Sequence, residues 1–264
     1  MILQTRAHST SDSDTTETGA GESLPSESSN VQQAGRQTIA RMDEGRALSP
    51  QALEPQRLIH TQMRDFRQLD LFRELRSNLL SRTTSRNPVI VVSGVAPGCG
   101  SSFLARNLAA SIAFDPERTA LLMDCNFQHA TLAEDFRLES DCPGLADLFG
   151  QPGLELADAI HASGVPRLRV MPAGRSAHRG VEFFASVRMR ALLQELKSRY
   201  EDRSVVIDAP PALGSPDARI LGDQADLIVL VAAEANHFIE TIRRAAAVFP
   251  ANRFAGVVFN QPTG

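Results

Sequence analysis

Lysine is almost absent from this sequence. Of its 264 residues, 27 are lysine or arginine, and Lys197 is the single lysine among them. Any chemistry that needs an ε-amino group must therefore use Lys197 or proceed without one. The sequence also contains no tryptophan and one tyrosine, Tyr200.

A surplus of positive charge is missing as well. The 31 acidic residues outnumber the 27 basic ones and give a net charge of −4, which argues against a nucleic-acid-binding surface. No run reaches the roughly 18 apolar residues that a membrane span needs, and the first residues turn polar too soon for a signal peptide. We therefore expect a cytoplasmic protein, peripheral at the inner face of the plasma membrane only through a partner.

The sequence has few cysteines, and their spacing matches no paired motif. The sequence has three of them, Cys99, Cys125 and Cys142, and none forms a C-x-x-C pair. An odd number without a secretion signal favours free thiols in a reducing compartment. The sequence thus gives no reason to expect a disulfide or a structural metal site.

Charge and composition divide the chain into three regions. Between Arg6 and Arg36 there are five acidic residues, no basic residue and many Ser, Thr and Gly. Such a stretch cannot bury enough apolar surface to offset its conformational entropy. We therefore predict a disordered tail over residues 1–45, a helical arm over 46–86 with helical periodicity from about Leu53 to Leu80, and a domain over 87–264.

The domain alternates short apolar runs with helical patterns. Continuous apolar runs are typical of parallel strands that are covered on both faces, and helices between them indicate right-handed crossovers. The sequence therefore predicts an α/β fold with a parallel β-sheet flanked by helices. The expected strands are 89–92, 119–123, 168–171, 204–207, 227–231 and 254–260, and the expected longer helices are 101–114, 187–200 and 237–248.

A glycine-rich loop joins the first expected strand to a helix. It reads Gly-Val-Ala-Pro-Gly-Cys-Gly-Ser-Ser, and in this context backbone N–H groups and the helix N-terminus cradle phosphate in a P-loop. The usual pattern ends Gly-Lys-Ser/Thr, with the lysine on the phosphates and the hydroxyl on Mg²⁺. The alternative is a glycine-rich turn that binds nothing. The candidate nucleotide-binding residues are Gly94, Pro97, Gly98, Cys99, Gly100, Ser101 and Ser102.

Two carboxylates follow buried strands on the same expected edge of the sheet. Asp124 ends the run Leu121 to Asp124, and Asp208 ends Val205 to Asp208. Ligands of open parallel sheets bind beyond the carboxyl ends of strands, where acids can hold Mg²⁺ directly or through water. Asp124 and Asp208 are therefore candidate catalytic residues and, with Ser102, candidate Mg²⁺ ligands. The alternative for each acid is a helix N-cap.

These motifs together resemble the bacterial tyrosine kinases of capsule and exopolysaccharide synthesis, within the ParA- and MinD-like P-loop ATPases. The segments that carry the resemblance are the loop with Pro97 and Gly98, residues 121–131, 171–174, 205–211 and 215–218, and the closing 257–260. The resemblance implies a kinase-type P-loop fold that binds ATP or ADP with Mg²⁺, and that Asn260 contacts the adenine base.

The expected N-terminal helix carries a further point of resemblance. Asp70, Arg73 and Arg76 are similar to the Glu-x-x-Arg-x-x-Arg motif that the family uses in ring assembly. Spacing of three places these side chains along one helix flank, where they can pair across subunits of a homo-oligomer. A solvated charged face is the alternative.

The sequence also departs from the family at the residues that carry catalysis. Ser101 replaces the lysine, Asn126 replaces the second acid of an Asp-x-Asp motif, and Gln128 stands where a basic residue is usual. The family's C-terminal tyrosine cluster does not follow Asn260, and we interpret Tyr200 as structural. Loss of the lysine removes a cation that stabilises transition-state charge, so ATP, ADP and Mg²⁺ binding is expected to be weakened.

These observations favour a degenerate homologue that regulates exopolysaccharide production. The implied partner is the cytoplasmic segment of a membrane polysaccharide chain-length or co-polymerase protein, and no nucleic acid is expected. Two alternatives remain open, namely an active ATPase of the MinD or ParA type and a tyrosine kinase that phosphorylates a partner in trans.

Overall fold

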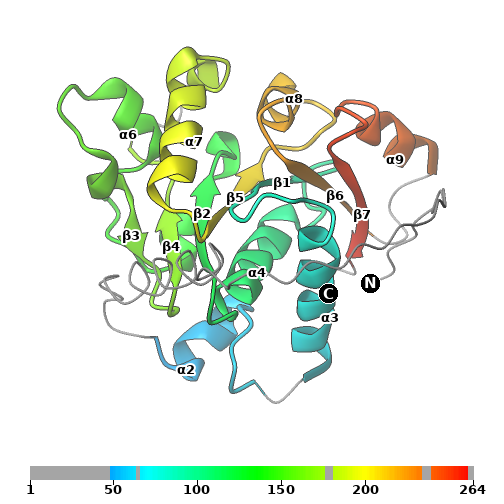
Figure 1. The fold of residues 1–264 in the computed structure, drawn as a ribbon, viewed down its shortest axis with the longest axis horizontal. Helices are drawn as coiled ribbons and strands as arrows, with labels where there is room; N and C mark the ends of the chain where they lie inside the picture. The colour runs from blue at the N-terminus through cyan, green and yellow to red at the C-terminus, as the bar shows by residue number, and fades with distance from the viewer. Residues whose placement is uncertain (1–47, 64–65, 176–180, 234–238, 261–264) are drawn as a thin grey trace, which may run out of the picture.

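The computed structural model describes residues 48–63, 66–175, 181–233 and 239–260. The expected tail over 1–45 lies outside the described residues. The described part of the chain forms a β-sheet with helices on both faces, which confirms the expected fold class (Figure 1).

The sheet has the strand order β3-β4-β2-β5-β1-β6-β7. All neighbouring strands run parallel except β3, which pairs antiparallel with β4. Every residue of the central strands β1, β2, β5 and β6 is buried, as expected for strands covered on both faces. The strands are β1 (Val89–Gly94), β2 (Thr119–Asp124), β3 (His161–Ala162), β4 (Leu168–Met171), β5 (Arg203–Ala209), β6 (Leu227–Ala233) and β7 (Phe254–Asn260).

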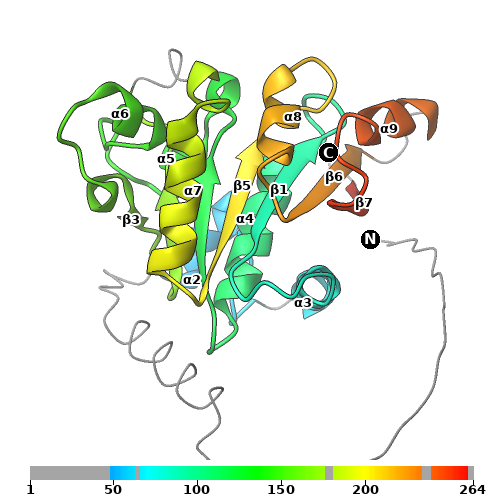
Figure 2. The same cartoon turned by 45° about the horizontal axis from the view of Figure 1, so that its top comes forward.

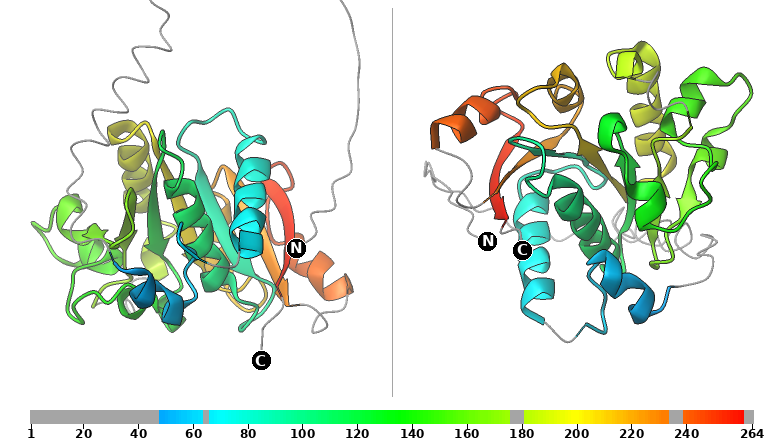
Figure 3. Two further views of the ribbon diagram at one scale, coloured as in Figure 1. Left: turned by 90° about the horizontal axis from the view of Figure 1, so that it is seen from below. Right: turned by 180° about the vertical axis from the view of Figure 1, so that it is seen from behind.

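The longer helices are α3 (Phe66–Leu80), α4 (Ser101–Ala113), α7 (Val187–Arg199), α8 (Pro216–Gly222) and α9 (Ile239–Ala246). Helices α3 and α4 lie side by side on one face of the sheet, and α7 and α8 cover the other (Figures 2 and 3). The shorter elements are α2 (Pro50–Leu53), η1 (Glu54–Gln56), η2 (Phe127–His129), α5 (Leu132–Asp135), α6 (Leu145–Gly150), η3 (Leu156–Ala159) and η5 (Val181–Phe183).

The expected helix from Leu53 to Leu80 is wrong in its first half. Residues 57–63 form turns and extended chain between η1 and α3. Within this segment the N–H of Ile59 donates to a side chain and not to a helical carbonyl, since its acceptor is Oδ1 of Asn107 at 2.7 Å. The Nδ2 of Asn107 donates in turn to the carbonyls of Arg57 and Phe103. A buried asparagine on α4 thus fixes the entry of the chain into the domain.

The carboxyl ends of the central strands meet at one edge of the sheet. Asp124 of β2 lies opposite Asp208 of β5, and Ser93 of β1 lies opposite Ala209 of β5. The glycine loop follows β1 at this same edge and leads into α4. This register brings the loop and both strand-end acids together, as the sequence predicted.

Candidate functional site

The loop after β1 adopts a conformation that depends on glycine. Gly98 and Gly100 have φ angles of 81° and 84°, in the left-handed region that side chains with a Cβ rarely adopt. A Cβ on Gly98 would meet open space, whereas a Cβ on Gly100 would overlap the side chain of Asn260. The loop therefore keeps the bare backbone with which a P-loop approaches a phosphate.

Asn260 and Cys99 hold this loop from within. The Nδ2 of Asn260, at the end of β7, donates to the carbonyl of Cys99 at 3.1 Å. The Cys99 thiol is buried and accepts a bond from the N–H of Ala96 at 3.3 Å. Asn260 thus braces the loop backbone, while its expected contact with adenine stays a prediction.

Ser101 begins α4 at the position where a P-loop lysine usually stands. Its Oγ lies 3.5 Å from where a Cβ on Gly94 would be, so the short side chain folds back against the loop. Ser102 follows, and its hydroxyl forms a hydrogen bond with Asp208. The hydroxyl that would serve Mg²⁺ in a P-loop is therefore in the expected place beside the expected acid.

Lys197 cannot replace the missing cation, because it lies at the opposite edge of the sheet. Its Nζ is 2.7 Å from Oδ2 of Asp226. The same oxygen accepts a bond from the N–H of Val89, the first residue of β1. The loop begins at the other end of that strand, at Gly94. The single lysine of the chain therefore has a structural contact far from the phosphate cradle.

Asp124 is fully buried, and both of its oxygens are engaged. They accept bonds from the N–H groups of Asn126, at 3.1 Å, and Leu132, at 3.3 Å. Burial first, and then the charge of Asp208, raise the pKa of Asp124 well above its usual value, while the backbone bonds oppose them. Leu132 is the first residue of α5, so Asp124 also contacts the start of this short helix. Asp124 is not its N-cap, however, because Thr131 occupies that position.

Asp208 is also buried but is less fully satisfied. Its Oδ1 has no hydrogen-bond partner in the described structure. Burial raises the pKa of Asp208 to about 7, while the hydrogen bond from Ser102 and the charge of Arg106 lower it and Asp135 raises it further. A buried oxygen without a partner is unusual in a folded protein, so Oδ1 of Asp208 marks a group that the described residues leave unsatisfied.

A partly buried ion pair between Arg106 and Asp135 lies on this side of the site, and the sequence interpretation missed it. Arg106 lies on α4 one turn after Ser102, and its guanidinium pairs with the Asp135 carboxylate at the end of α5. The side chains are 13% and 19% exposed. The i,i+4 spacing from Ser102 is the signal that could have placed Arg106 on this helix face.

These residues fit the two parts of a Mg²⁺–nucleotide complex unequally. The glycine backbone and the N-terminus of α4 suit a phosphate group. The described residues contain no group of three or more His, Cys, Asp or Glu arranged to hold a metal ion. Both carboxylate oxygens of Asp124 accept hydrogen bonds from backbone N–H groups, and the positive charge of Arg106 acts on Asp208. The cradle therefore fits phosphate, whereas the carboxylates do not form a Mg²⁺ site of their own.

The three residues expected in oligomerisation lie on α3 but do not act alike. Asp70 and Arg73 are exposed and pair with each other at 3.2 Å. Arg76 instead donates to the carbonyl of Ser111 on α4 at 2.6 Å. Asp70 and Arg73 are thus available at the surface, while Arg76 ties α3 to α4. Their part in assembly stays a prediction.

Tyr200 has the structural surroundings that the sequence suggested. The guanidinium of the buried Arg203 lies over its ring, 3.7 Å from the ring centre. Its carbonyl accepts a bond from Nδ2 of Asn87 at 3.0 Å. These contacts fix the turn between α7 and β5.

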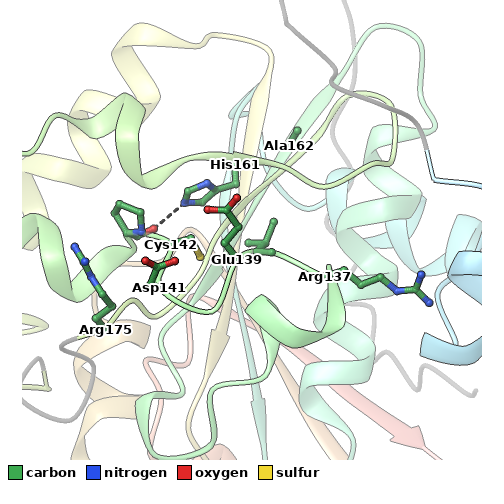
Figure 4. Close-up of a pocket in the computed structure, with 9 residues that line it drawn as sticks. Arg137, Glu139, Asp141, Cys142, His161, Ala162 and Arg175 are labelled. Carbon is green, nitrogen blue, oxygen red and sulfur yellow. Dashed lines mark hydrogen bonds between the residues drawn. The ribbon is translucent and has the colours of Figure 1, made fainter.

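A separate cavity of about 530 Å³ opens at the β3 edge of the sheet, with β4, β2 and β5 between it and the loop. Figure 4 shows acidic side chains, Glu139 and Asp141, near its centre, while Arg137 and Arg175 point to opposite sides. His161 is occupied by a contact of 2.7 Å with the carbonyl of Pro143. None of the site residues expected from the sequence lines this cavity.

Comparisons with known proteins give the chain its relatives. No model of a known protein family matches it. It is 28% identical over 195 residues to tyrosine-protein kinase Wzc of Salmonella typhimurium, an alignment that covers 73% of this chain and 26% of that kinase. It is 30% identical over 161 residues to tyrosine-protein kinase YwqD of Bacillus subtilis, covering 61% and 66%. The chain thus spans about a quarter of the length of Wzc.

Solved structures agree with these relatives. The BceF tyrosine kinase domain superimposes with a TM-score of 0.67 and 26% identity, over 86% of this chain and 96% of that domain. The structure of McdA from Cyanothece, with a TM-score of 0.54 and 18% identity over 66% of this chain and 71% of that one, shares the fold. The chain is therefore a homologue of the bacterial tyrosine-protein kinases, built on the fold of the ParA-like P-loop ATPases.

Proposed function

We propose that this chain is a regulatory, catalytically degenerate tyrosine-kinase-like protein of exopolysaccharide or capsule synthesis. In this proposal it binds ATP or ADP weakly and turns over very slowly or not at all. It acts on the cytoplasmic segment of a membrane chain-length or co-polymerase protein. The observation that carries the proposal is an intact glycine cradle whose lysine position holds Ser101, with Lys197 bound to Asp226 at the other edge of the sheet.

The loss of the lysine bears on turnover more than on folding. The loop keeps its left-handed glycines and its brace from Asn260 without it. Phosphoryl transfer, however, depends on cations that stabilise the charge of the transition state. Removing one such group commonly costs about 3 kcal/mol, or roughly a hundredfold in rate or more. The site can therefore keep a binding role after its catalytic role is lost.

The proposed partner is suggested by the resemblance to capsule and exopolysaccharide kinases. No helix among the described residues is long and apolar enough to cross a membrane. The exposed pair Asp70 and Arg73 on α3 offers a charged surface for assembly with that partner or with a second copy. Co-purification with the co-polymerase segment, and its loss in an Asp70→Arg variant, would test this part of the proposal.

The test of degeneracy restores the missing charge. Ser101→Lys places an ε-amino group at the start of α4, and Ser101→Met is a control of similar length without charge. We expect Ser101→Lys to bind ATP about tenfold more tightly than the unaltered chain by calorimetry, because it adds a charge-assisted contact worth about 1.4 kcal/mol. Ser101→Met should show no gain.

Phosphorylation is measured in parallel on a tyrosine-containing peptide with labelled ATP. We expect no turnover from the unaltered chain above that of an Asp208→Asn variant. Robust ATP-dependent phosphorylation by the unaltered chain would overturn the proposal in favour of a kinase that acts in trans. ATP hydrolysis with nucleotide-dependent dimerisation would favour an active ATPase of the MinD or ParA type.

A further inference from the structure

The second turn of α4 carries Arg106, whose charge acts on the strand-end acid Asp208. Residues i and i+4 of a helix lie on one face, and helical side chains lean toward the N-terminus. The Arg106 side chain therefore extends back toward Ser102, whose hydroxyl bonds to Asp208. The ion pair with Asp135 holds the Arg106 guanidinium against the end of α5, and its charge acts on Asp208.

Both the guanidinium and the Asp208 carboxyl are left incomplete by the protein itself. The Nε–H of Arg106 and the Oδ1 of Asp208 are buried and have no hydrogen-bond partner. The Asp208 side chain is almost wholly buried, with the residue 1% exposed. Buried polar groups normally find partners, so this donor and this acceptor are two groups that the contacts of the described residues leave incomplete.

The charges around this point differ from those of a magnesium site. In a P-loop the serine hydroxyl and the strand-end acid receive Mg²⁺, and the metal neutralises the phosphates. Here a guanidinium that pairs with Asp135 lies one helical turn after this hydroxyl, and its positive charge acts on the same acid. A divalent ion at Ser102 would face this fixed positive charge at low effective dielectric, where repulsion is strong.

We propose that Arg106 is a built-in cation that takes the place of Mg²⁺ at Ser102 and Asp208, so that nucleotide binding to this chain does not require a divalent metal. The proposal rests on the nucleotide site of the proposed function. It assigns the ligand class as a nucleoside di- or triphosphate in its metal-free form. Arg106 then acts as a specificity-determining residue, which selects the free nucleotide over its magnesium complex.

The first test measures ADP binding to the full chain by calorimetry, in excess EDTA and in excess Mg²⁺. We expect the dissociation constant of the unaltered chain to differ by less than about twofold between the two conditions. Arg106→Ala should bind ADP about tenfold more weakly in EDTA, and Mg²⁺ should recover most of that loss, because one charge-assisted contact is worth about a factor of ten. Arg106→Lys should keep the metal independence.

The matched control is Arg118→Ala, which removes an arginine paired with Asp115 away from the loop. It should leave both dissociation constants unchanged. Because Arg106→Ala leaves Asp135 without its partner, Arg106→Gln serves as a second variant that keeps a hydrogen-bond donor, and circular dichroism checks the fold of each. Mg²⁺-dependent binding by the unaltered chain, unchanged in Arg106→Ala and Arg106→Gln, would overturn the proposal.

A second test needs no nucleotide and separates this proposal from the proposed function. Mn²⁺ is titrated into the nucleotide-free chain and followed by electron paramagnetic resonance. Removing the guanidinium leaves Asp208 and Asp135 without their cation, so Arg106→Gln should bind Mn²⁺ at least about tenfold more tightly than the unaltered chain. Equal Mn²⁺ binding by the two proteins would overturn the role of Arg106. Failure of ADP to bind in either condition, with the Mn²⁺ difference present, would count against the nucleotide-binding function alone.

Discussion

The buried carboxyl of Asp208 gives the protein a pH dependence of stability that follows from the structure. Burial raises its pKa from 3.8 to about 7. The folded state therefore holds this proton more tightly than the unfolded state does. The stabilisation is complete below the unfolded pKa and is lost as the pH rises through about 7. At about 1.4 kcal/mol for each pKa unit, the loss reaches roughly 4 kcal/mol above that pH.

Asp208→Asn should remove this dependence, because the amide has the same size and does not titrate in this range. The measured quantity is the free energy of unfolding of the variant minus that of the unaltered chain. The pKa shift of Asp208 predicts that this difference rises by roughly 2–3 kcal/mol between about pH 5 and about pH 8. Any pH-independent cost, such as a weaker bond with Ser102, cancels in this comparison. The groups that face Asp208 are Asp124, Ser102, Arg106 and Asp135.

The assay is urea unfolding followed by far-ultraviolet circular dichroism, because the chain has no tryptophan to report on unfolding. Glu240→Gln on α9, where the side chain is 72% exposed, serves as the control and should follow the unaltered chain at both pH values. A difference between Asp208→Asn and the unaltered chain that is equal at both pH values would show that burial of this carboxyl has no such energetic effect.

Two further predictions concern contacts away from the loop. Asn107→Ala should lower the free energy of unfolding by about 2–3 kcal/mol, because the N–H of Ile59 and two carbonyls lose their hydrogen-bond partner. Limited proteolysis of the variant should then cut first within residues 57–63. An unchanged cleavage pattern would contradict the role assigned to this side chain. Lys197→Met should lower the free energy of unfolding by only about 1 kcal/mol in the same urea assay, since the ion pair with Asp226 is partly exposed. Nucleotide binding should not change. Weaker nucleotide binding by this variant would contradict the structural role of the lysine.

Much of the fold was accessible from local sequence patterns. Continuous apolar runs predicted six of the strands, and their order with the helices predicted the parallel sheet, because both signals are short in range. The two-residue strand β3 was missed, since so short a strand exists only through its antiparallel pairing with β4. The break at residues 57–63 was missed for a related reason, because a side chain 48 positions away, Asn107, takes the backbone bond of Ile59.

The sequence by itself determined the framework of the site. Glycines at 98 and 100, serines at 101 and 102 and acids that close buried strands are all local features, and a parallel sheet necessarily brings them to one edge. The absence of lysine from the loop was equally plain. Only the tertiary structure decided which charges face that framework, because ion pairs join residues that are distant in the chain. It paired Lys197 with Asp226 at the far edge and Arg106 with Asp135 on α5, from where the charge of Arg106 acts on Asp208.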